Sequence, residues 1–511
     1  MYPTLADVLE GTATRYPEKT AIEYPRKDQS WTYREFDANA NRLANALADL
    51  GVEHGDRVST DLYNGSELVT AAFACAKLGA VFNPLNYRLP AGDVEFILND
   101  ADSEVLLFEE DTREVVEKAK SDLGVSEYVY IDDDAPEYAR DFYELLDDAS
   151  AERPDTVVDE TDAYAFIYTS GTTGRPKGVV HEHRDMVEHD LICIAEGEYK
   201  KSDVGLSCMP LYHCAELHAA FFVRVHLGAT SVIHHDFDPG AVLSAIEEYG
   251  VSVLFAAPTG WNAVATAYEA DPDEYDVSSL RMGMYGAAPM PKDTLERCRE
   301  HLTDDFLQAY GMTEIGPCGV FLHPEDQTRK LGAAGLPALN HEMRVVEPDA
   351  DPDEEVDPGD VGEILLAGPC TMREYWNRPE ATAQSLREAD GVEWYYTGDL
   401  GYVDEDGYLT VVDRKDDMII SGGENVYPSR IEDALFSHPE VRDAAVVGEP
   451  DDEWGEKVVA YVVADASAEE LDSFLVESDD VADFERPREY YFREELPTTP
   501  SGKVKKYELR E

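Results

Sequence analysis

The chain has 511 residues, 43% of them hydrophobic, so it is long enough for more than one buried core and is not disordered. Its 108 acidic and 42 basic side chains give a formal net charge of −66. This charge excludes nonspecific binding to nucleic acid and docking on an anionic membrane surface.

The first predicted elements alternate between helix and strand. Thr32-x-x-Glu35 is a capping box, the apolar positions of 36–47 recur at helical spacing, and Gly51 suits the end of that helix. Strand-like runs at 57–62 and 105–108 flank a helical run at 67–78. This alternation predicts parallel sheets with helices packed on them.

The same alternation continues, and then changes in character. A helix at 240–249 followed by a strand at 251–255 forms another such unit, whereas 147–162 and 348–360 are predicted to be surface loops. From about residue 360 the strands become shorter, with turns at 404–407 and 422–423.

Residues 168–178 carry the densest chemical pattern, Tyr-Thr-Ser-Gly-Thr-Thr-Gly-Arg-Pro-Lys-Gly. The apolar run 164–168 predicts a buried strand before it, and Val179-Val180 begins another after it. Glycines let backbone N–H groups approach an anion, hydroxyls donate hydrogen bonds, and Arg175 and Lys177 offset phosphate charge. The segment therefore predicts a polyphosphate site without a Walker A sequence, the alternative being an ordinary hairpin loop.

This loop resembles the signature of the adenylate-forming enzymes, in particular the acyl-CoA synthetase branch that includes 4-chlorobenzoate–CoA ligase. Further segments resemble that family's motifs in the family's order. They are Met209-Pro-Leu-Tyr-His213, Tyr285-Gly-Ala-Ala-Pro289, Gln308-Ala-Tyr-Gly-Met-Thr-Glu314, Tyr396-Thr-Gly-Asp399, the segment Asp413–Asn425 and Pro500-Ser-Gly-Lys503.

The resemblance implies an α/β fold with two domains. A large N-terminal domain of parallel-rich sheets with packed helices, residues 1–415, would bind ATP and the acyl group. A small, mobile α+β C-terminal domain, residues 416–511, would carry the catalytic lysine and the contacts to coenzyme A. Asp416 matches the hinge position of the family.

The resemblance also implies a reaction in two halves. A carboxylate attacks the α-phosphorus of ATP to give an acyl-adenylate and pyrophosphate, and a thiol then releases AMP and forms a thioester. Anions meet in the first half, so cations and oriented donors are needed where charge builds up. The matching ATP and AMP positions are Thr169, Ser170, Gly171, Thr172, Thr173, Gly174, Lys177, Gly286, Ala287, Ala288, Tyr310, Gly311, Thr313, Asp399 and Arg414.

Four of the implied residues would be catalytic: Lys503, Thr313, Glu314 and Lys177. Lys503 would bridge the substrate carboxylate and the α-phosphate, with a plain basic tail as the alternative because Lys505 and Lys506 follow. By resemblance Thr313 bonds the α-phosphate and Glu314 helps to hold Mg²⁺, for which one carboxylate is sufficient beside phosphate ligands.

The second substrate implied is coenzyme A. Its matching positions are Ser421, Gly422, Gly423, Trp454, Arg486 and Arg488, where the arginines would meet phosphates and Trp454 would pack on the CoA. Glu485 departs from the family pattern, because a basic residue often stands there. A surface arginine pair is the alternative for Arg486 and Arg488.

The acyl pocket is assigned to His213, Cys214, Phe255, Ala287, Ala309 and Gly311. The small residues leave room for a chain or ring, and none of them supplies a lysine or arginine for a second substrate carboxylate. An apolar monocarboxylate, either a short- or medium-chain fatty acid or an aryl acid, is therefore expected. A core histidine is the alternative for His213.

Cysteine usage and the absence of apolar segments bear on the compartment. The seven cysteines are odd in number and show neither Cys-x-x-Cys nor a zinc-type spacing, which favours buried thiols in a reducing cytosol. Residues 1–20 lack the features of a signal peptide, and no stretch approaches the roughly 20 apolar residues of a membrane helix. We expect a cytoplasmic protein without integral membrane association, for which a homodimer is one permitted state.

The acidic residues are spread along the chain, which predicts a halophilic source, the alternative being an acidic mesophilic protein.

The leading interpretation is an acyl-CoA synthetase that uses ATP, Mg²⁺ and coenzyme A. No carrier-protein segment follows Lys503, which favours CoA over a carrier protein as the acceptor. The alternatives are a stand-alone adenylation enzyme that loads a carrier protein, a luciferase-like oxygenase, and a nucleotide-binding sensor without turnover. Intact Glu314, Asp399 and Lys503 argue against the sensor.

Overall fold

The computed structural model describes residues 3–169, 175–422, 424–451, 454–478, 481–498 and 504–510. In this part of the chain two compact units are found. The first comprises the described residues of 3–342 together with 366–387, and the second comprises 343–365 and the described residues of 388–510. The predicted domain boundary at Asp416 falls inside the second unit, because the strands before it group with the C-terminal segment. That boundary stays a prediction.

One sheet of the first unit is mainly parallel and contains the strands on both sides of the glycine-rich loop. Its order is β19-β9-β8-β4-β3-β5-β6-β7. Only the hairpin β8–β9 and the short β19 pair antiparallel. The strands are β3 (Arg57–Asp61), β4 (Val81–Pro84), β5 (Ser103–Phe108), β6 (Glu127–Tyr130), β7 (Arg140–Asp141), β8 (Ala163–Thr169), β9 (Lys177–Glu182) and β19 (Glu374–Tyr375).

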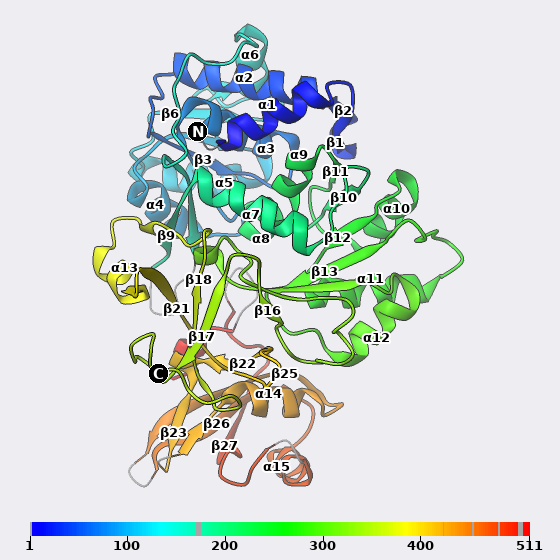
Figure 1. Ribbon diagram of the computed structural model, residues 1–511, viewed down its shortest axis with the longest axis vertical. Coiled ribbons are helices and arrows are strands. Elements are labelled where there is room, and N and C mark those ends of the chain that lie inside the picture. Colours follow the sequence, from blue (N-terminus) through cyan, green and yellow to red (C-terminus); the bar gives the residue numbers. More distant parts are fainter. Residues whose placement is uncertain are drawn as a thin grey trace. The chain divides into compact units, whose positions relative to one another are not determined.

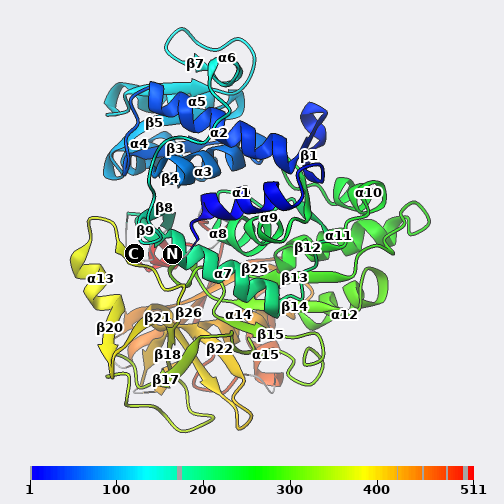
Figure 2. The same cartoon turned by 45° about the horizontal axis from the view of Figure 1, so that its top comes forward.

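Helices cover both faces of this sheet, as Figure 2 shows. In β5 the side chains alternate: Val105 and Leu107 enter the core shared with α1–α3, whereas Leu106 and Phe108 enter the core beneath α4 and α5. The helices are α1 (Leu5–Arg15), α2 (Tyr33–Asp49), α3 (Ser66–Leu78), α4 (Ala91–Asp100), α5 (Glu110–Ala119) and α6 (Phe142–Asp148), with short 3₁₀ turns at Pro25–Lys27 and Lys120–Asp122.

The second sheet of the first unit has the order β16-β15-β14-β13-β12-β10-β11-β1-β2. The run from β14 to β1 is parallel throughout, and α10–α12 lie beside it (Figure 1). The strands are β1 (Thr20–Tyr24), β2 (Gln29–Thr32), β10 (Val204–Ser207), β11 (Thr230–Ile233), β12 (Val253–Phe255), β13 (Met282–Gly286), β14 (Phe306–Tyr310), β15 (Val320–Leu322) and β16 (Leu336–Pro337).

The helices of this part include one irregular segment. A π-helical segment, Leu217–Phe222, joins α8 to α9, which the sequence did not indicate. The regular helices are α7 (His183–Glu196), α8 (Cys214–Glu216), α9 (Val223–Leu227), α10 (Pro239–Tyr249), α11 (Pro258–Ala270), α12 (Lys292–His301) and α13 (Pro379–Ser385), with a 3₁₀ turn at Thr313–Ile315.

The second unit is built on two antiparallel-rich sheets. The first contains β17 (Glu342–Val346), β18 (Gly362–Ala367), β20 (Leu386–Ala389), β21 (Val392–Val403) and β22 (Leu409–Arg414). Glu342, the end of β18 at 366–367 and the start of β20 at 386–387 belong to the first unit. The second contains β23 (Ile419–Ser421), β24 (Glu424–Val426), β25 (Val441–Asp451), β26 (Gly455–Ala464) and β27 (Glu489–Phe492). A 3₁₀ turn at Lys415–Asp417 precedes β23, and the helices are α14 (Pro428–Phe436), α15 (Ala468–Glu477) and α16 (Lys506–Leu509).

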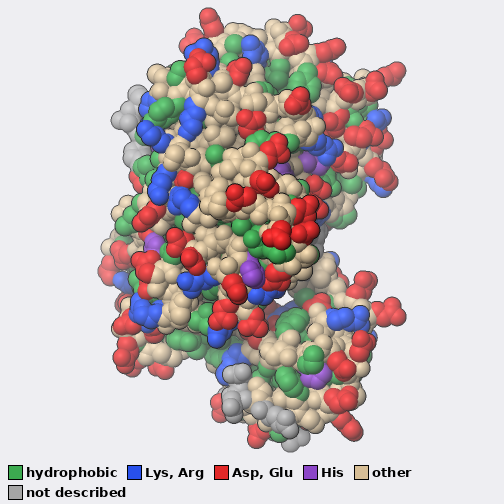
Figure 3. All heavy atoms as spheres, turned by 90° about the vertical axis from the view of Figure 1, so that its right-hand side faces the viewer, with side chains coloured by type: hydrophobic (Ala, Val, Ile, Leu, Met, Phe, Trp, Pro, Cys, Tyr) green, Lys and Arg blue, Asp and Glu red, His purple; other side chains and the backbone are tan. Residues whose placement is uncertain are grey.

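The predicted α/β class with parallel-rich sheets is confirmed by this topology, as are the predicted helices and strands of the N-terminal part. The capping box of Thr32 and Glu35 is present at the start of α2. Among the described residues, none of the helices combines the length and apolar character that crossing a bilayer requires. Asp and Glu side chains are spread over the face drawn in Figure 3, among isolated Lys and Arg.

Candidate functional site

Several of the predicted residues lie at one edge of the nine-strand order that includes β10, β12, β13 and β14. These four strands are parallel neighbours, so their carboxyl ends meet at the same edge. The residues at or just beyond those ends are Met209–His213 after β10, Phe255 on β12, Ala287 after β13 and Gly311 after β14. The carboxyl edge of parallel strands is where open α/β sheets bind ligands.

The backbone at the ends of β13 and β14 is packed so tightly that it requires glycine. A β-carbon on Gly286 would lie 2.7 Å from the Ala309 carbonyl oxygen, and one on Gly311 would lie 2.1 Å from that of Pro317. Ala287 has a φ of +66°, in the left-handed region, and is exposed. Together with half-buried Tyr310, Gly286, Ala287 and Gly311 form an uncharged group of residues, which is called the ledge below.

Thr313 and Glu314 follow this ledge in the 3₁₀ turn Thr313–Ile315, and both are buried. The hydroxyl of Tyr375 donates to Glu314 Oε1 at 2.7 Å, and the Met372 amide donates to the Glu314 carbonyl at 2.8 Å. His181 Nε2 donates to the Thr313 carbonyl at 2.6 Å. One oxygen of the Glu314 carboxylate is thus hydrogen-bonded to another side chain, which fixes the position of the carboxylate.

Lys177, one of the two cations of the glycine-rich segment, lies next to the same tyrosine. Thr169 and Lys177 are cross-strand partners where the β8–β9 hairpin opens. The ammonium of Lys177 lies 4.5 Å from the centre of the Tyr375 ring. Tyr375 therefore contacts both Lys177 and Glu314. Ser170, Gly171, Thr172, Thr173 and Gly174 lie outside the described residues.

The residues assigned to the acyl pocket occupy different depths. Phe255 and Ala309 are half-buried, and His213 is exposed, so it is not a core histidine. His213 Nδ1 accepts the Ala215 amide at 3.1 Å and caps α8. Cys214 is buried beneath Thr313, with Sγ 3.1 Å from Thr313 Oγ1. Burial raises the pKa of Cys214 to about 12, so this thiol stays protonated.

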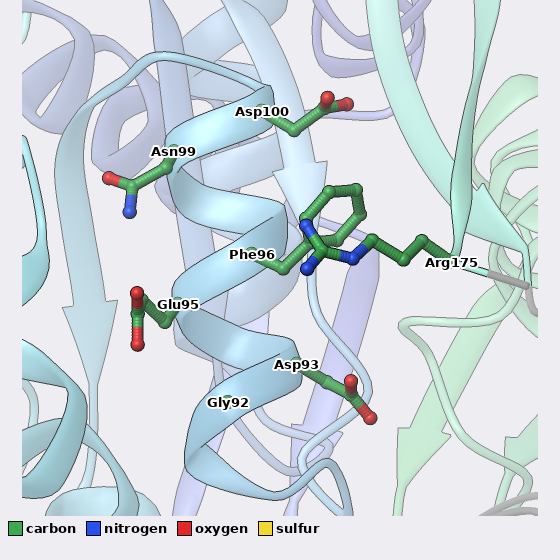
Figure 4. A pocket seen from close by; sticks show the side chains of 7 residues that line it. All are labelled: Gly92, Asp93, Glu95, Phe96, Asn99, Asp100 and Arg175. Carbon is green, nitrogen blue, oxygen red and sulfur yellow. The ribbon is translucent and has the colours of Figure 1, made fainter.

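A cavity of about 420 Å³ lies elsewhere, over α4. Figure 4 shows Arg175 reaching across Phe96, with the guanidinium carbon 4.9 Å from the ring centre. The remaining lining residues are Gly92, Asp93, Glu95, Asn99 and Asp100. Three carboxylates make this cavity unsuitable for phosphate, and it contains none of the predicted acyl-pocket residues.

In the second unit, Asp399 and Arg414 form an ion pair. Arg414 Nη1 donates to Asp399 Oδ1 at 2.7 Å across the β21–β22 ladder. Asp399 does not end a strand, because β21 continues to Val403. The ladder shifts register just after it, and Gly398 has a φ of +68°. The strand is therefore irregular on both sides of Asp399. Arg414 is 41% exposed, so the pair has access to solvent.

The predicted hinge residue Asp416 lies in the 3₁₀ turn Lys415–Asp417. Arg510 donates to the Asp416 carbonyl at 3.1 Å and to Asp417 Oδ1 at 2.9 Å. The turn is therefore held by the C-terminal segment within the second unit. Lys503 lies outside the described residues.

Some of the predicted CoA-binding residues lie together. The Gly422 amide donates to the Trp454 carbonyl at 2.8 Å, and the guanidinium carbon of Arg488 lies 3.8 Å from the centre of the Trp454 ring. Ser421 is buried, and its hydroxyl finds no hydrogen-bond partner among the described residues. Gly423 lies outside them.

Arg486 is engaged differently from Arg488. Its guanidinium contacts Asp472 at 2.8 Å and Asp483 at 3.5 Å, which reduces its availability for a phosphate. Glu485, the departure from the family pattern, is buried, accepts the Ala482 amide at 2.7 Å and pairs with Arg430. Its carboxylate is therefore a structural group of this turn.

Two supporting residues were not predicted. Tyr375 and His181 hold Glu314 and Thr313, respectively, and both come from the β9–β19 edge. Neither lies in a motif that was singled out. The available signal was chemical: a histidine directly after the apolar pair Val179-Val180, and a tyrosine beside Trp376.

Two family models match the chain. That of the AMP-binding enzyme covers residues 9–376, and that of the AMP-binding enzyme C-terminal domain covers 430–503. The chain belongs to the AMP-binding enzyme family. Adenylate formation is the common chemistry of this family, so the resemblance drawn from the sequence motifs is confirmed.

Known members of the AMP-binding family match over nearly the whole chain. A feruloyl-CoA synthase from an Amycolatopsis species is 38% identical over 97% of this chain and 96% of its own. The fatty acid–[acyl-carrier-protein] ligase ScoC of Streptomyces coeruleorubidus is 35% identical, covering 100% of this chain and 97% of its own. The structure of Bacillus subtilis o-succinylbenzoate CoA synthetase with its acyl-adenylate intermediate has a TM-score of 0.87 and 32% identity, covering 100% of this chain and 99% of that one.

Proposed function

We propose that this protein is an AMP-forming acyl-CoA synthetase that converts an apolar monocarboxylate, through its acyl-adenylate, to the CoA thioester. The observation that carries the proposal is the Lys177–Tyr375–Glu314 arrangement beside the carboxyl edge of β10 and β12–β14. It sets a cation and a carboxylate next to an uncharged ledge, as adenylation of a carboxylate requires.

In the adenylation half, a substrate carboxylate oxygen forms a bond to the α-phosphorus and pyrophosphate leaves. We assign to Lys177 and residues 169–174 the β- and γ-phosphates, and to Thr313 the α-phosphate. Lys503 would neutralise the attacking carboxylate and the α-phosphate as charge shifts between them. Tyr310 and Gly286–Ala288 would hold the adenine, and Asp399 with Arg414 the ribose.

Mg²⁺ fits Glu314 in its donor chemistry. Hard cations of this kind take oxygen ligands, keep several waters and are bound largely by substrate phosphates. Tyr375 donates to Oε1 of Glu314, and we assign the second carboxylate oxygen to the ion. The ion would offset charge on the leaving pyrophosphate, while Tyr375 keeps the carboxylate in place.

In the second half the CoA thiol attacks the acyl carbonyl and AMP leaves. We assign to Ser421–Gly423, Trp454 and Arg488 the recognition of CoA, with Arg486 contributing after release from Asp472. The buried hydroxyl of Ser421, which has no hydrogen-bond partner among the described residues, and the Trp454–Arg488 stack support this assignment. Asp416 is proposed to be the hinge that changes access between the two halves.

The substrate class follows from the residues assigned to the acyl pocket. Phe255, Ala287, Ala309 and Gly311 are small or apolar and partly exposed, so they suit an alkyl chain or an aromatic ring. His213 and Cys214 would lie next to the bound acyl group, and Cys214 would support Thr313 from below. We expect short- or medium-chain fatty acids or aryl acids as substrates.

The direct assay is pyrophosphate release from Mg-ATP with a panel of aliphatic and aromatic monocarboxylates in high KCl, with and without CoA. We expect one acid class to be turned over and CoA to accelerate turnover. The relative that charges an acyl-carrier protein makes carrier loading the second candidate. Pyrophosphate release that does not depend on CoA but is accelerated by a carrier protein would favour that candidate. No pyrophosphate release with any acid would favour a nucleotide-binding sensor.

The hinge is tested separately by Asp416→Pro. Proline fixes φ and so prevents the dihedral change that a hinge requires. We expect pyrophosphate formation to persist and thioester formation to be lost. Glu405→Gln, on an exposed turn of the same unit, serves as the control and should leave both rates unchanged. Equal retention of both half-reactions in Asp416→Pro would remove the hinge from the account.

We further propose a cytoplasmic location in a halophilic organism. All seven cysteines are free and buried, which agrees with a reducing compartment. The net charge of −66 and the acidic side chains spread over the face drawn in Figure 3 agree with a salt-rich cytoplasm.

A further inference from the structure

One asparagine side chain connects the two sheets of the first unit. Asn64 lies in the loop after β3 of the eight-strand sheet and is 2% exposed. Its Nδ2 donates to the Met209 carbonyl at 2.9 Å, and its Oδ1 accepts the Leu211 amide at 2.7 Å. Met209 and Leu211 follow β10, which belongs to the nine-strand sheet. The backbone amide of Asn64 donates to the His235 carbonyl at 3.3 Å, just beyond the end of β11.

The hydrogen-bonding pattern of asparagine matches this position. Pro210 has no N–H, so the Met209 carbonyl and the Leu211 amide flank a residue that cannot donate. A side-chain amide offers a donor and an acceptor together, and both are used here. The Leu211 amide can only donate and the Met209 carbonyl can only accept, which fixes the orientation of the Asn64 amide. Aspartate would lack the donor, and alanine would leave both backbone groups without this partner.

Aromatic rings hold the same segment from a second loop. Tyr63, next to Asn64, stacks on Tyr87 with 3.7 Å between the ring centres. Tyr87 meets the ring of Tyr212 edge to face, with 5.3 Å between the centres. Since Tyr87 follows β4, the loops after β3 and β4 both contact the segment after β10.

The segment held in this way leads directly to residues assigned to the acyl pocket. The His213 amide donates to the Pro210 carbonyl at 3.1 Å, and the His213 side chain caps α8. Cys214 follows, with its Sγ 3.1 Å from Thr313 Oγ1. The place of His213 therefore depends on the bend at Pro210, whose two sides Asn64 binds.

We propose that Asn64 is a positioning residue for the acid substrate. By binding the backbone on both sides of Pro210, it fixes the segment 209–213 and with it the part of the acyl pocket assigned to His213 and Cys214. This role rests on the proposed function and adds to it a residue outside the pocket that sets selectivity among acids.

The residues assigned to ATP and Mg²⁺ have supports of their own. His181 Nε2 donates to the Thr313 carbonyl at 2.6 Å, and Tyr375 donates to Glu314 at 2.7 Å. Asn64 takes part in neither contact. Its loss should therefore change the kinetic constants of the acid more than those of ATP, a split that a general loss of stability would not produce.

Asn64→Ala is measured by pyrophosphate release in high KCl, with the acid selected by the panel and two acids of neighbouring size. We expect KM for the selected acid to rise by about 10- to 100-fold, because displacing a pocket wall by about 1 Å misplaces the substrate. KM for Mg-ATP should stay within about two-fold of the wild type. The preference for the selected acid over its neighbours in size should narrow. KM and this preference do not depend on how much of the variant is folded, so a destabilised variant still decides.

Asn64→Asp is the second variant, because it keeps the volume and the acceptor for Leu211 but lacks the donor for Met209. KM for the acid should rise in this variant too. Asn41→Ala is the matched control: it removes another buried amide, on α2, which donates to the Ala151 carbonyl at 3.0 Å. KM for the acid and the preference among acids should not change in Asn41→Ala.

Different outcomes reject the positioning role and the proposed function. A wild type that turns over no acid of the panel would reject both. An active wild type together with an unchanged KM for the acid in Asn64→Ala or Asn64→Asp would reject the positioning role alone. An equal rise of KM for the acid and for Mg-ATP, or the same rise in Asn41→Ala, would also reject it.

Discussion

Glu314 in the proposed adenylation site is held in place by several hydrogen bonds. Its carboxylate is buried, accepts a hydrogen bond from Tyr375, and lies in a turn held by Met372 and His181. A carboxylate fixed in this way needs little reorganisation when charge develops on a nearby phosphate or its cation. The same tyrosine contacts Lys177, so the two charged groups share one support.

Replacing this carboxylate tests its role directly. Glu314→Gln keeps the shape and an acceptor for Tyr375 but removes the charge assigned to Mg²⁺. We expect kcat/KM for pyrophosphate formation to fall by about 10²–10³, the usual effect of losing one electrostatic stabiliser. Glu325→Gln, an exposed carboxylate on the following loop, is the control. Activity within a few-fold of the wild type in Glu314→Gln would reject the assignment.

Asp61 carries a pH dependence of stability. It is buried at the end of β3, its Oδ1 has no hydrogen-bond partner among the described residues, and burial raises its pKa to about 7. The unfolded chain has an aspartate pKa near 3.9. Between about pH 4 and 7 the folded state therefore retains a proton that the unfolded state has lost. Its contribution to the free energy of unfolding declines as pH rises through that window.

Asp61→Asn removes that contribution. We expect the stability of this variant relative to wild type to increase from pH 4 to 7, by at most about 1.4 kcal/mol per pH unit. Urea unfolding at a series of pH values measures the difference. The exposed Asp133→Asn should give a difference that does not change with pH. A flat profile for Asp61→Asn would show that the carboxyl is already ionised in the folded protein.

Motif residues could be predicted one by one, but their supports could not. Thr313, Glu314 and Asp399 stand in local patterns that the sequence displays. Tyr375 reaches Glu314 only because β19 pairs with β9, far away in the chain. The Cys318 amide likewise donates to His189 Nε2 across 129 residues, a contact that no local pattern displays.

At the scale of elements, local signals agree with the structure where capping and periodicity coincide. Helix α2 begins after Thr32, whose hydroxyl accepts the Glu35 amide while the Glu35 carboxylate accepts the Thr32 amide at 2.8 Å. The continuation of β21 beyond Asp399 and the π-helical segment Leu217–Phe222 were not predicted. Both depend on register and packing with distant segments, which a local pattern does not encode.

The capping box gives a prediction for α2. Thr32→Ala leaves the Glu35 amide without its acceptor, so the free energy of unfolding should fall by about 1 kcal/mol. Ser30→Ala, an exposed position on the preceding strand, should change it by less than about 0.5 kcal/mol. Urea unfolding in concentrated KCl compares the two. An equal effect of both substitutions would mean that the cap does not stabilise the helix.

At the scale of the whole molecule, charge is the dominant feature. With a net charge of −66 spread over the surface, the folded state is subject to strong self-repulsion in dilute buffer. Salt shortens the Debye length from about 10 Å at 0.1 M to about 3 Å at 1 M, which relieves it. The self-repulsion can be predicted from composition, and the family can be predicted from the motifs. The grouping of residues 343–365 with the C-terminal segment is seen only in the structure.

We therefore expect Tm to rise steadily as KCl increases from 0.1 to 3 M, with activity following the same trend. A family member of near-neutral charge, measured in parallel, controls for general salting effects. Full stability and full activity of this protein in the absence of added salt would contradict the proposed halophilic origin.

The central claim is that the acid becomes joined to AMP before it meets the thiol. The most direct measurement uses the acid selected by the panel, labelled with ¹⁸O in its carboxylate, together with Mg-ATP and CoA. If the carboxylate attacks the α-phosphorus and the thiol then attacks the carbonyl, the AMP produced carries one ¹⁸O and the thioester carries the other. Unlabelled AMP, or ADP with labelled inorganic phosphate, would contradict the account.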